Sequence, residues 1–362
     1  MSAPMPPRER LPGLDVLRGL AAVAVMAFHF STRFGGIFGH PAALAFYVPW
    51  GQRGVEVFFV ISGFAIELSL ESTSSAREFL WSRAVRLYPT FWAALAVTLA
   101  VVGIFGLPER VISFQSALLN VTMIPVSLGA AAADAVYWTL ERELRFYGLV
   151  LLLLALGLRR YTVHALLATV LLQTFGANAT WIPHWLSDLT NFGWAHLFAS
   201  GMLLARARRN ASLQMYALVA LCLMASRALG FTQFAYSSAA VALVWLATRA
   251  SVHGALTHAL AWLGRISYPL YLVHQYVGYV VMRALYARGA SPGVAIACAS
   301  AVVLGLALAL HFLVERRSLD VIRRMRGRKP QRDSLERAGF DSGPHPPEQS
   351  ARSLQRARSS AG

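Results

Sequence analysis

Charged residues and cysteines are scarce in this chain of 362 residues. Asp, Glu, Lys and Arg make up 14% of it and hydrophobic residues 56%, whereas soluble domains average about 25% charged residues. The two cysteines, Cys222 and Cys298, lie inside apolar stretches and form neither a disulfide framework nor a metal motif. A phosphate-binding glycine loop is also missing. The composition argues against a soluble enzyme and predicts an all-α, polytopic membrane protein without a metal site.

Basic residues outnumber acidic ones, 33 to 17, which gives a formal net charge of +16. In a soluble protein such an excess suggests a nucleic-acid partner. Here most basic residues lie between apolar runs, as is typical of loops at the cytoplasmic face of a membrane. We therefore expect membrane lipid, and no nucleic acid, among the partners.

Ten apolar runs are long enough to cross a bilayer, which takes about 20 residues. The predicted spans are 11–31, 52–72, 87–106, 136–158, 161–177, 191–206, 212–229, 231–248, 265–287 and 292–315. A further run, 111–128, contains Gln115, Asn120 and Pro125, and counting it as a span would move two arginine clusters to the outside. We therefore predict about ten transmembrane helices and treat 111–128 as a re-entrant or interfacial segment.

Loop arginines also set the predicted orientation. If the N-terminus is cytoplasmic, Arg77, Arg83, Arg86 and the clusters at 159–160 and 206–209 all lie on the inside. The prediction is a multi-pass protein of the inner cell membrane with both termini in the cytoplasm.

The two ends of the chain differ from its apolar middle, 11–315. Residues 1–10 are polar and basic, and we predict a cytoplasmic N-terminal segment. The first apolar run has no convincing cleavage site after it and is expected to be a retained helix. Residues 316–362 are rich in Arg, Ser, Pro and Gly, which predicts a disordered basic cytoplasmic tail.

Ionisable residues inside apolar helices are costly, so each is a candidate functional residue. Arg18 and His29 are eleven residues apart, which places them on one helix face, about 16 Å from each other along the axis. Asp15 lies three residues before Arg18 and can pair with it. The competing interpretations are that Arg18 extends to the cytoplasmic interface and that His29 makes a structural hydrogen bond.

Two other predicted spans carry carboxylates. Glu56 lies near the outer end of 52–72, and Glu143 lies in the charged first turns of 136–158. From their distance to the cytoplasmic end of each span, we expect His29, Glu56 and Glu143 in the outer half of the membrane. The alternative for Glu143 is a solvated helix end with local ion pairs.

Arginines are expected at the opposite face. Arg83 and Arg86 are spaced i, i+3, so both guanidinium groups point to one side of a helix and suit a polyanionic phosphate. Arginines here are equally typical of the positive-inside signal alone. His274 lies inside the span 265–287, where a histidine more often packs or forms a hydrogen bond.

Together these segments resemble the acyltransferase-3 family of membrane O-acyltransferases. The resemblance extends over residues 11–315, to the stand-alone type without an added hydrolase-like domain. Family members often have a second glutamate after the one at 143, where this chain has Leu144. The matching pieces are Leu14-Asp15-Val16-Leu17-Arg18-Gly19 with His29, the stretch GVEVFFVISGF, Arg83-x-x-Arg86-Leu-Tyr-Pro, Trp138-Thr139-Leu140-x-x-Glu143, and Ile266-Ser267-Tyr268-Pro269 through His274.

The resemblance implies a ten-helix enzyme that takes an acyl group, usually acetyl, from cytoplasmic acyl-CoA. The acceptor would be a hydroxyl of a cell-surface or lipid-linked carbohydrate, and acyl-CoA would be a co-substrate with no other cofactor. On this basis His29 is the expected general base, and Glu143 or Glu56 would hold its ring. The remaining expected roles are phosphate binding by Arg18, Arg83 and Arg86, and support by Asp15 and His274.

Two alternatives stay open at this stage. The acyl group can pass through a covalent intermediate on Ser62 or on His29. Interior charges also suit a transporter or exporter of a small metabolite or glycan precursor. The acceptor is expected to meet the outer loops near 32–51 and 178–191. Trp181, Trp185 and Trp194 either stack on a sugar or, as we favour, form an interfacial belt.

Overall fold

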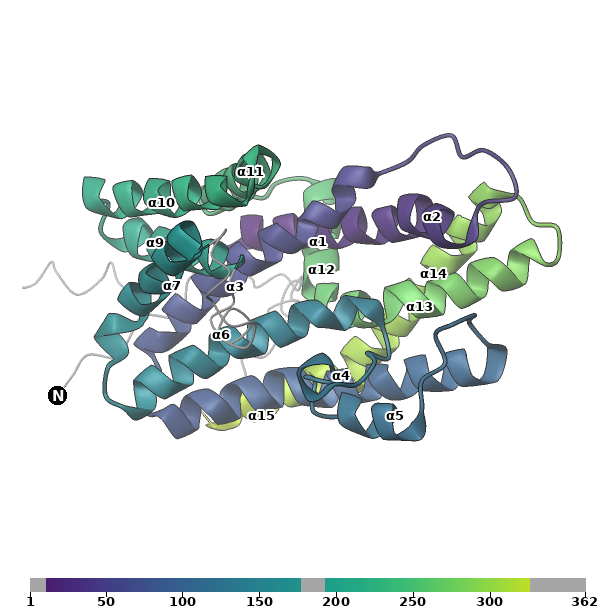
Figure 1. Cartoon of the computed structure of the whole chain (residues 1–362), viewed down its shortest axis with the longest axis horizontal. Coiled ribbons are helices and arrows are strands. Elements are labelled where there is room, and N and C mark those ends of the chain that lie inside the picture. Colours follow the sequence, from purple (N-terminus) through teal and green to yellow (C-terminus); the bar gives the residue numbers. More distant parts are fainter. Residues whose placement is uncertain (1–10, 177–192, 326–362) are drawn as a thin grey trace, which may run out of the picture. The chain divides into compact units, whose positions relative to one another are not determined.

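The computed structural model describes residues 11–176 and 193–325, and these fold into helices joined by loops (Figure 1). The described residues contain no strand, which confirms the all-α prediction for this part of the chain. The predicted segment 1–10, the loop 178–191 and the tail from 326 onward lie outside the described residues. The helices are α1 (Pro12–Phe28), α2 (Phe34–Phe38), α3 (Gly54–Glu71), α4 (Ala76–Phe105), α5 (Phe114–Asn120), α6 (Trp138–Ala155), α7 (Thr162–Gly176), α9 (Ala195–Arg209), α10 (Leu213–Ser226), α11 (Phe231–Ala247), α12 (Ala255–Arg265), α13 (Ser267–Tyr286), α14 (Pro292–Leu310) and α15 (Arg316–Met325).

Three helical stretches are long and apolar enough to cross a membrane: Pro12–Phe38, Ala76–Phe105 and Pro292–Ile322. Leu213–Leu229 and Phe231–Ala247 are shorter apolar helices. These helices support a membrane protein, and the count of ten crossings stays a prediction. The segment 111–128 contains α5, of 7 residues, and the 3₁₀ turn Val126–Leu128. Both are far shorter than the about 20 residues that a crossing needs.

Some helix boundaries differ from the prediction. Helix α4 begins at Ala76 rather than at 87, because the Ser75 side chain caps it and accepts a hydrogen bond from the Glu78 amide at 3.2 Å. Helix α12 was not predicted as a separate element. At the other end, α15 continues the helical path to Met325, past the predicted boundary at 315.

Glycines allow two pairs of helices to approach closely. A Cβ atom at Gly63 of α3 would lie 2.2 Å from the Phe198 carbonyl oxygen of α9, and one at Gly201 of α9 would lie 2.0 Å from the Val60 carbonyl oxygen. The two backbones therefore touch where only hydrogen atoms fit, as small residues allow in membrane helices.

Helix α1 packs closely against α12 in the same way. A Cβ atom at Gly19 would lie 2.2 Å from the Leu260 carbonyl oxygen, and one at Gly264 would lie 1.8 Å from the Asp15 carbonyl oxygen. This contact fixes the part of α1 that carries Arg18, and His29 follows directly after the end of the same helix.

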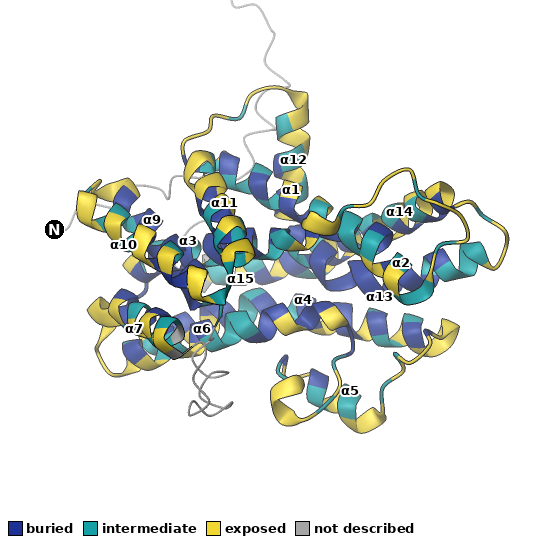
Figure 2. Cartoon of the chain, turned by 45° about the horizontal axis from the view of Figure 1, so that its top comes forward, coloured by how far each residue is buried: buried dark blue, intermediate teal, exposed yellow. Residues whose placement is uncertain are grey.

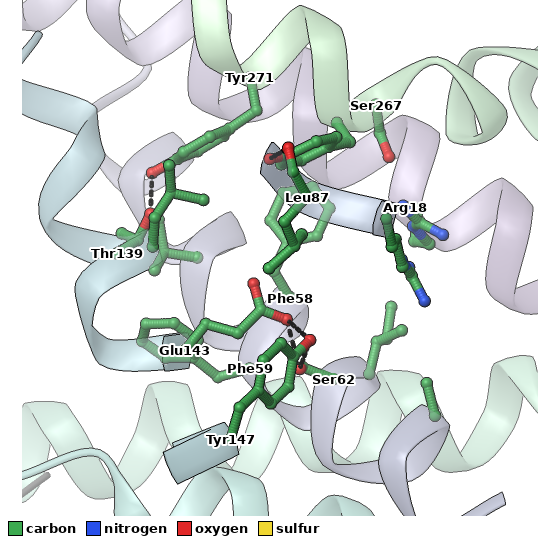
Figure 3. A pocket seen from close by; sticks show the side chains of 16 residues that line it. Arg18, Phe58, Phe59, Ser62, Leu87, Thr139, Glu143, Tyr147, Ser267 and Tyr271 are labelled. Carbon is green, nitrogen blue, oxygen red and sulfur yellow. Dashed lines mark hydrogen bonds between the residues drawn. The ribbon is translucent and has the colours of Figure 1, made fainter. Parts of the chain in front are cut away.

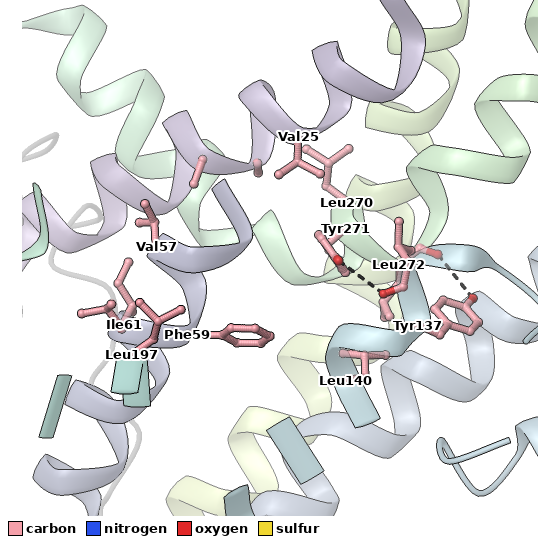
Figure 4. Close-up of a cluster of buried hydrophobic side chains, with 14 of the residues drawn as sticks. Val25, Val57, Phe59, Ile61, Tyr137, Leu140, Leu197, Leu270, Tyr271 and Leu272 are labelled. Carbon is pink, nitrogen blue, oxygen red and sulfur yellow. Dashed lines mark hydrogen bonds between the residues drawn. The ribbon is translucent and has the colours of Figure 1, made fainter. Parts of the chain in front are cut away.

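Buried side chains of α3, α6 and α13 belong to one hydrophobic cluster (Figure 4). Figure 2 shows buried residues along each of these helices. Phe59 of α3, Leu140 of α6 and Leu272 of α13 are all buried. The Tyr137 hydroxyl joins the start of α6 to α13 by donating to the Leu272 carbonyl oxygen at 3.3 Å (Figure 4). In contrast, Phe105 at the end of α4 is 71% exposed, as expected for an apolar side chain that faces lipid.

Candidate active site

A π-helical turn carries the predicted base. Helix α1 ends at Phe28, and the chain continues through His29–Arg33 with π-helical hydrogen bonding before α2 begins. Single π turns within helices are frequent at functional sites. Here both ends of the turn, His29 and Arg33, line one cavity.

We call this space the histidine cavity, and its volume is about 400 Å³. Its walls come from the end of α1 and the π turn, from the start of α3, and from residues around α6, α9 and α13. The lining residues are Val25, Phe28, His29, Arg33, Gln52, Arg53, Val55, Glu56, Ala135, Val136, Trp138, Trp194, Tyr271 and Gln275.

A second histidine contacts the first. His274 Nε2 lies 3.1 Å from His29 Nδ1, and the two rings meet edge to face with their centroids 4.9 Å apart. His29 Nδ1 also lies 2.9 Å from the Val25 carbonyl oxygen, and His274 Nδ1 lies 2.8 Å from the Tyr271 carbonyl oxygen. His274 is buried, and it comes from α13, 245 residues further along the chain.

These contacts determine which nitrogens carry protons. A carbonyl oxygen only accepts, so Nδ1 of each ring must be the donor. In the neutral pair, His274 Nε2 is then a bare acceptor for the His29 Nδ1 proton. His29 Nε2 keeps its lone pair and has no hydrogen-bond partner in the described part of the chain, so it is ready to accept a proton.

The predicted contact between a carboxylate and His29 is not formed in the described residues. Glu56 lines the histidine cavity, but its Oε1 accepts from Arg53 Nη1 at 2.9 Å and from Gln233 Nε2 at 3.1 Å. The Val25 carbonyl and His274 take the place predicted for the carboxylate. Sequence spacing does not reveal this contact, because His274 reaches His29 only through the packing of α13 on α1.

Two acceptors beside the cavity are unpaired. Glu56 Oε2 and Gln275 Oε1 are buried and have no hydrogen-bond partner among the described atoms. Trp138 and Trp194, with ring centroids 5.3 Å apart, add an aromatic wall. Trp194 therefore lines a cavity, and the interfacial belt stays a prediction. Trp181 and Trp185 lie outside the described residues.

The second space, the arginine pocket, is smaller, with a volume of about 120 Å³ (Figure 3). Helices α1, α3, α4, α6 and α13 contribute to its walls. The lining residues are Arg18, Val55, Phe58, Phe59, Ile61, Ser62, Ala65, Arg86, Leu87, Thr139, Leu140, Glu143, Tyr147, Ser267, Tyr268 and Tyr271.

Glu143 belongs to this pocket rather than to the surroundings of His29. Ser62 Oγ donates to Glu143 Oε1 at 2.6 Å, and the Tyr147 hydroxyl donates to the same oxygen (Figure 3). The structure thus brings Glu143 together with Arg18 and Arg86, which were predicted to lie at a different depth. The reason is that α6 presents Glu143 toward α3, one helix layer away from His29.

Arg83 and Arg86, which were predicted to act together, have different surroundings. Arg86 lines the arginine pocket. Arg83 is buried beside it, where its Nη2 donates to Ser69 Oγ at 3.0 Å and its guanidinium lies 5.9 Å from the Tyr147 ring centroid. Residues at i and i+3 share a side of the helix. Here Arg83 contacts Ser69 of α3, and Arg86 lines the pocket instead.

Arg18 lines the arginine pocket, and several charges act on it. These belong to Arg86, Asp15, Glu143 and Glu315. Glu315 was not singled out from the sequence. It is buried in a second π-helical turn, His311–Glu315, where its Oε2 lies 2.6 Å from His311 Nδ1. The rule that flagged Arg18, a charge inside an apolar span, would have found it as well.

The two spaces adjoin each other. Val55 and Tyr271 line both of them. The Tyr271 hydroxyl accepts from Thr139 Oγ1 at 2.9 Å and donates to the Val136 carbonyl oxygen at 3.3 Å, while its own carbonyl holds His274. Tyr271 is therefore a shared wall, fixed at both ends, between a cavity with a free imidazole nitrogen and a pocket with two guanidinium groups.

A loop carboxyl connects this region to the chain before α6. Asp134 lies outside the predicted spans, and its oxygens accept from the Tyr276 amide at 3.0 Å and the Val136 amide at 3.2 Å. Burial raises the pKa of Asp134 to about 7, against the opposing effect of these backbone hydrogen bonds. The loop is thereby attached to α13 near His274.

Chemically, the arrangement combines a proton acceptor, an adjoining site for negative charge and a set of unpaired acceptors for hydroxyl groups. Among the described residues, no group of three or more His, Cys, Asp or Glu side chains is placed to hold a metal ion.

Comparison with known proteins adds a family match. A family model described as an acyltransferase domain matches residues 11–312. The chain is 32% identical over 153 residues to the acyltransferase MdmB of Streptomyces mycarofaciens, covering 40% of this chain and 39% of the relative. It is 36% identical over 104 residues to the exopolysaccharide production protein ExoZ of Rhizobium meliloti (strain 1021), covering 27% and 32%.

A further relative is nodulation protein 10 of Rhizobium leguminosarum bv. viciae, 30% identical over 177 residues, which are 43% of this chain and 47% of the relative. The chain thus matches less than half the length of each of these curated relatives. No solved structure matches it.

Proposed function

Because the chain belongs to the acyltransferase-3 family, we propose that it transfers an acyl group, acetyl in the first instance, from acyl-CoA to a carbohydrate hydroxyl. The observation that carries this proposal is the free Nε2 of His29 in a polar cavity that adjoins the arginine pocket. The membrane location is supported by the long apolar helices.

In the proposed reaction, the acceptor hydroxyl lies in the histidine cavity and gives its proton to His29 Nε2. The hydroxyl oxygen attacks the thioester carbonyl carbon, and the carbon–sulfur bond then breaks. The CoA sulfur leaves with the electron pair and takes the proton back from His29, so the products are the ester and the free thiol. His274 and the Val25 carbonyl keep the ring in the required tautomer throughout.

The arginine pocket is the proposed site of the donor. Arg86 and Arg18 would bind phosphate groups of CoA, since guanidinium groups form bidentate contacts with phosphate. The Arg83 side chain, held by Ser69, would support the position of α4 instead. Glu143 would offset the two cations and order Ser62 and Tyr147, rather than hold His29.

The proposed orientation places the arginine pocket toward the cytoplasm of a cell with an inner membrane. Arg18 lies in the first half of α1, and Arg86 lies in the first half of α4, toward the helix ends predicted to be inside. His29 lies at the opposite end of α1. Two relatives are named for exopolysaccharide production and for nodulation, and the first name supports a carbohydrate acceptor here.

The test uses membranes that contain the full chain, acetyl-CoA and the surface glycan of the producing cell. We expect release of the free CoA thiol and a mass increase of one acetyl group on the glycan, both lost in His29→Ala. Thiol release without glycan modification would indicate hydrolysis, and glycan movement without thiol release would favour the transporter alternative.

Ser62 offers a second route for the same reaction. Its hydroxyl donates to a carboxylate inside the arginine pocket, so an acyl group can pass through Ser62 before it reaches the acceptor. Brief incubation with labelled acetyl-CoA without acceptor separates the routes. Label bound covalently to the wild type but not to Ser62→Ala would establish the covalent route, and full activity of Ser62→Ala would exclude it.

A further inference from the structure

One charged group of the histidine cavity has no counter-charge. Arg33, at the end of the π turn, lines the cavity together with His29 and is exposed. Within residues 11–176 and 193–325, no carboxylate pairs with its guanidinium and no hydrogen bond holds it. The other charged residues that line the cavity are Arg53 and Glu56.

The other charges that line the cavity cancel. Arg53 Nη1 lies 2.9 Å from Glu56 Oε1, so the two form an ion pair. The Arg53 guanidinium also covers the Tyr236 ring, 4.3 Å from its centroid, which fixes it further. With His29 and His274 neutral, the cavity carries one net positive charge, which belongs to Arg33.

This charge bears on the proposed reaction. The Arg33 charge acts on the His29 ring, and His29 becomes a cation when it takes the proton from the acceptor. Two cations inside one cavity repel each other, which opposes the proton transfer. A bound anion beside Arg33 would remove this repulsion and stabilise the protonated ring.

We propose that the acceptor carries a negatively charged group, a carboxylate or a phosphate, close to the hydroxyl that is acylated, and that Arg33 binds this group. The inference rests on the proposed function and specifies its acceptor. Glu56 Oε2 and Gln275 Oε1 would accept hydrogen bonds from neutral hydroxyls of the same sugar. Trp138 and Trp194 would pack against the face of its ring. Among the described residues of the cavity, Arg33 is thus the group left for an anion.

The experiment varies both the charge of the acceptor and the charge of the residue at position 33, and it measures transfer for each combination. Membranes containing the full chain receive labelled acetyl-CoA and one of three preparations of the surface glycan of the producing cell. One preparation is untreated, one has its carboxyl groups reduced to alcohols, and one has its phosphates removed with cold hydrofluoric acid. Transfer is measured for the wild type, Arg33→Gln, Arg33→Lys and Arg288→Gln.

We expect one of the two treatments to lower wild-type transfer about tenfold or more, and that treatment identifies the anion. Arg33→Gln should lower transfer to the untreated glycan by a similar factor. On the neutralised glycan it should match or exceed the wild type, because the repulsion from Arg33 is gone, and this also shows that the variant is folded. Arg33→Lys should restore part of the rate. Arg288→Gln removes an arginine that does not line the cavity and donates to the Ala284 carbonyl oxygen at 2.7 Å, and it should behave as the wild type.

Two results would overturn the inference. One is equal wild-type transfer to all three preparations, and the other is the same loss in Arg33→Gln on the untreated and the neutralised glycans. If the wild type modifies none of the preparations, the proposed function itself fails, and this inference fails with it.

Discussion

The histidine cavity and the arginine pocket share a wall but differ in size and in how they hold their polar groups. The cavity, about 400 Å³, has one free guanidinium and two unpaired acceptors. The pocket, about 120 Å³, keeps its carboxylate occupied by two hydroxyl donors. A large space with unpaired groups suits a polar ligand of variable shape, and a narrow one with fixed groups suits a single invariant ligand.

The comparison also shows that one helix serves both spaces. Arg18 lies in the first half of α1, and the π turn that follows Phe28 carries His29, which lines the larger space. Changes in one space should therefore affect one substrate, whereas changes in the position of α1 should affect both. The predictions below test this division, from the largest expected effect to the smallest.

Removal of the base should affect the chemical step alone. We expect His29→Ala to lower kcat about 10²- to 10⁴-fold, the usual contribution of a general base. Binding of labelled CoA should stay at the wild-type level, because His29 does not line the arginine pocket. Equal loss of CoA binding would contradict the division into two sites.

The two arginines of the Arg83-x-x-Arg86 motif should respond differently. We expect Arg86→Gln to raise the KM for acyl-CoA about tenfold or more, since hydrogen bonds to charged groups contribute about 1.5–3 kcal/mol. Arg83→Gln is the matched control, because Arg83 contacts Ser69 rather than lining the pocket. It should lower the unfolding temperature in detergent and leave KM nearly unchanged, and a larger KM effect at 83 than at 86 would reverse the assignment.

His274 should act through His29 without binding either substrate. We expect His274→Ala to lower kcat about tenfold, by analogy with partners that orient a reactive residue through one hydrogen bond. Both KM values should change little. His274→Gln keeps an acceptor in reach of His29 Nδ1 and should recover part of the rate. If kcat of His274→Gln does not exceed that of His274→Ala, His274 has only a packing role.

The close contact between α1 and α12 should affect both the histidine cavity and the arginine pocket. A methyl group at Gly264 would lie 1.8 Å from the Asp15 carbonyl oxygen, and overpacking of this kind typically costs about 1–3 kcal/mol. We expect Gly264→Ala to lower the unfolding temperature in detergent and to weaken the binding of both substrates. Gly305→Ala is the control, because a Cβ atom there meets nothing within 4 Å.

The smallest effect concerns pH and Asp134. Burial raises the pKa of this carboxyl to about 7 from an ordinary value of 3.8. The folded state therefore prefers the protonated form, and this contribution to stability is complete below the ordinary pKa and is lost as the pH rises toward and beyond 7. The unfolding temperature of the wild type should fall between pH 5 and pH 8, and Asp134→Asn should show a flatter profile over the same range.

Much of the framework could be predicted from particular residues. The long apolar runs predicted helices. The segment 111–128, with Gln115, Asn120 and Pro125, forms only short helical pieces, and its re-entrant or interfacial place stays a prediction. The spacing of Arg18 and His29 predicted one helix with two candidate groups. Arg33 was missed because it lies in a predicted outer loop, where an arginine carries no signal of its own.

The sequence by itself determined the helical class and the family, and it supplied candidates for proton transfer and phosphate binding, because these depend on composition, motifs and local spacing. Only the tertiary structure decided which of those residues meet: His274 with His29, Glu143 with the arginines, and Arg86 apart from Arg83. The physical reason is that hydrogen bonds and cavities depend on which helix faces pack together, and the packing of separate helices leaves no periodic trace in one chain.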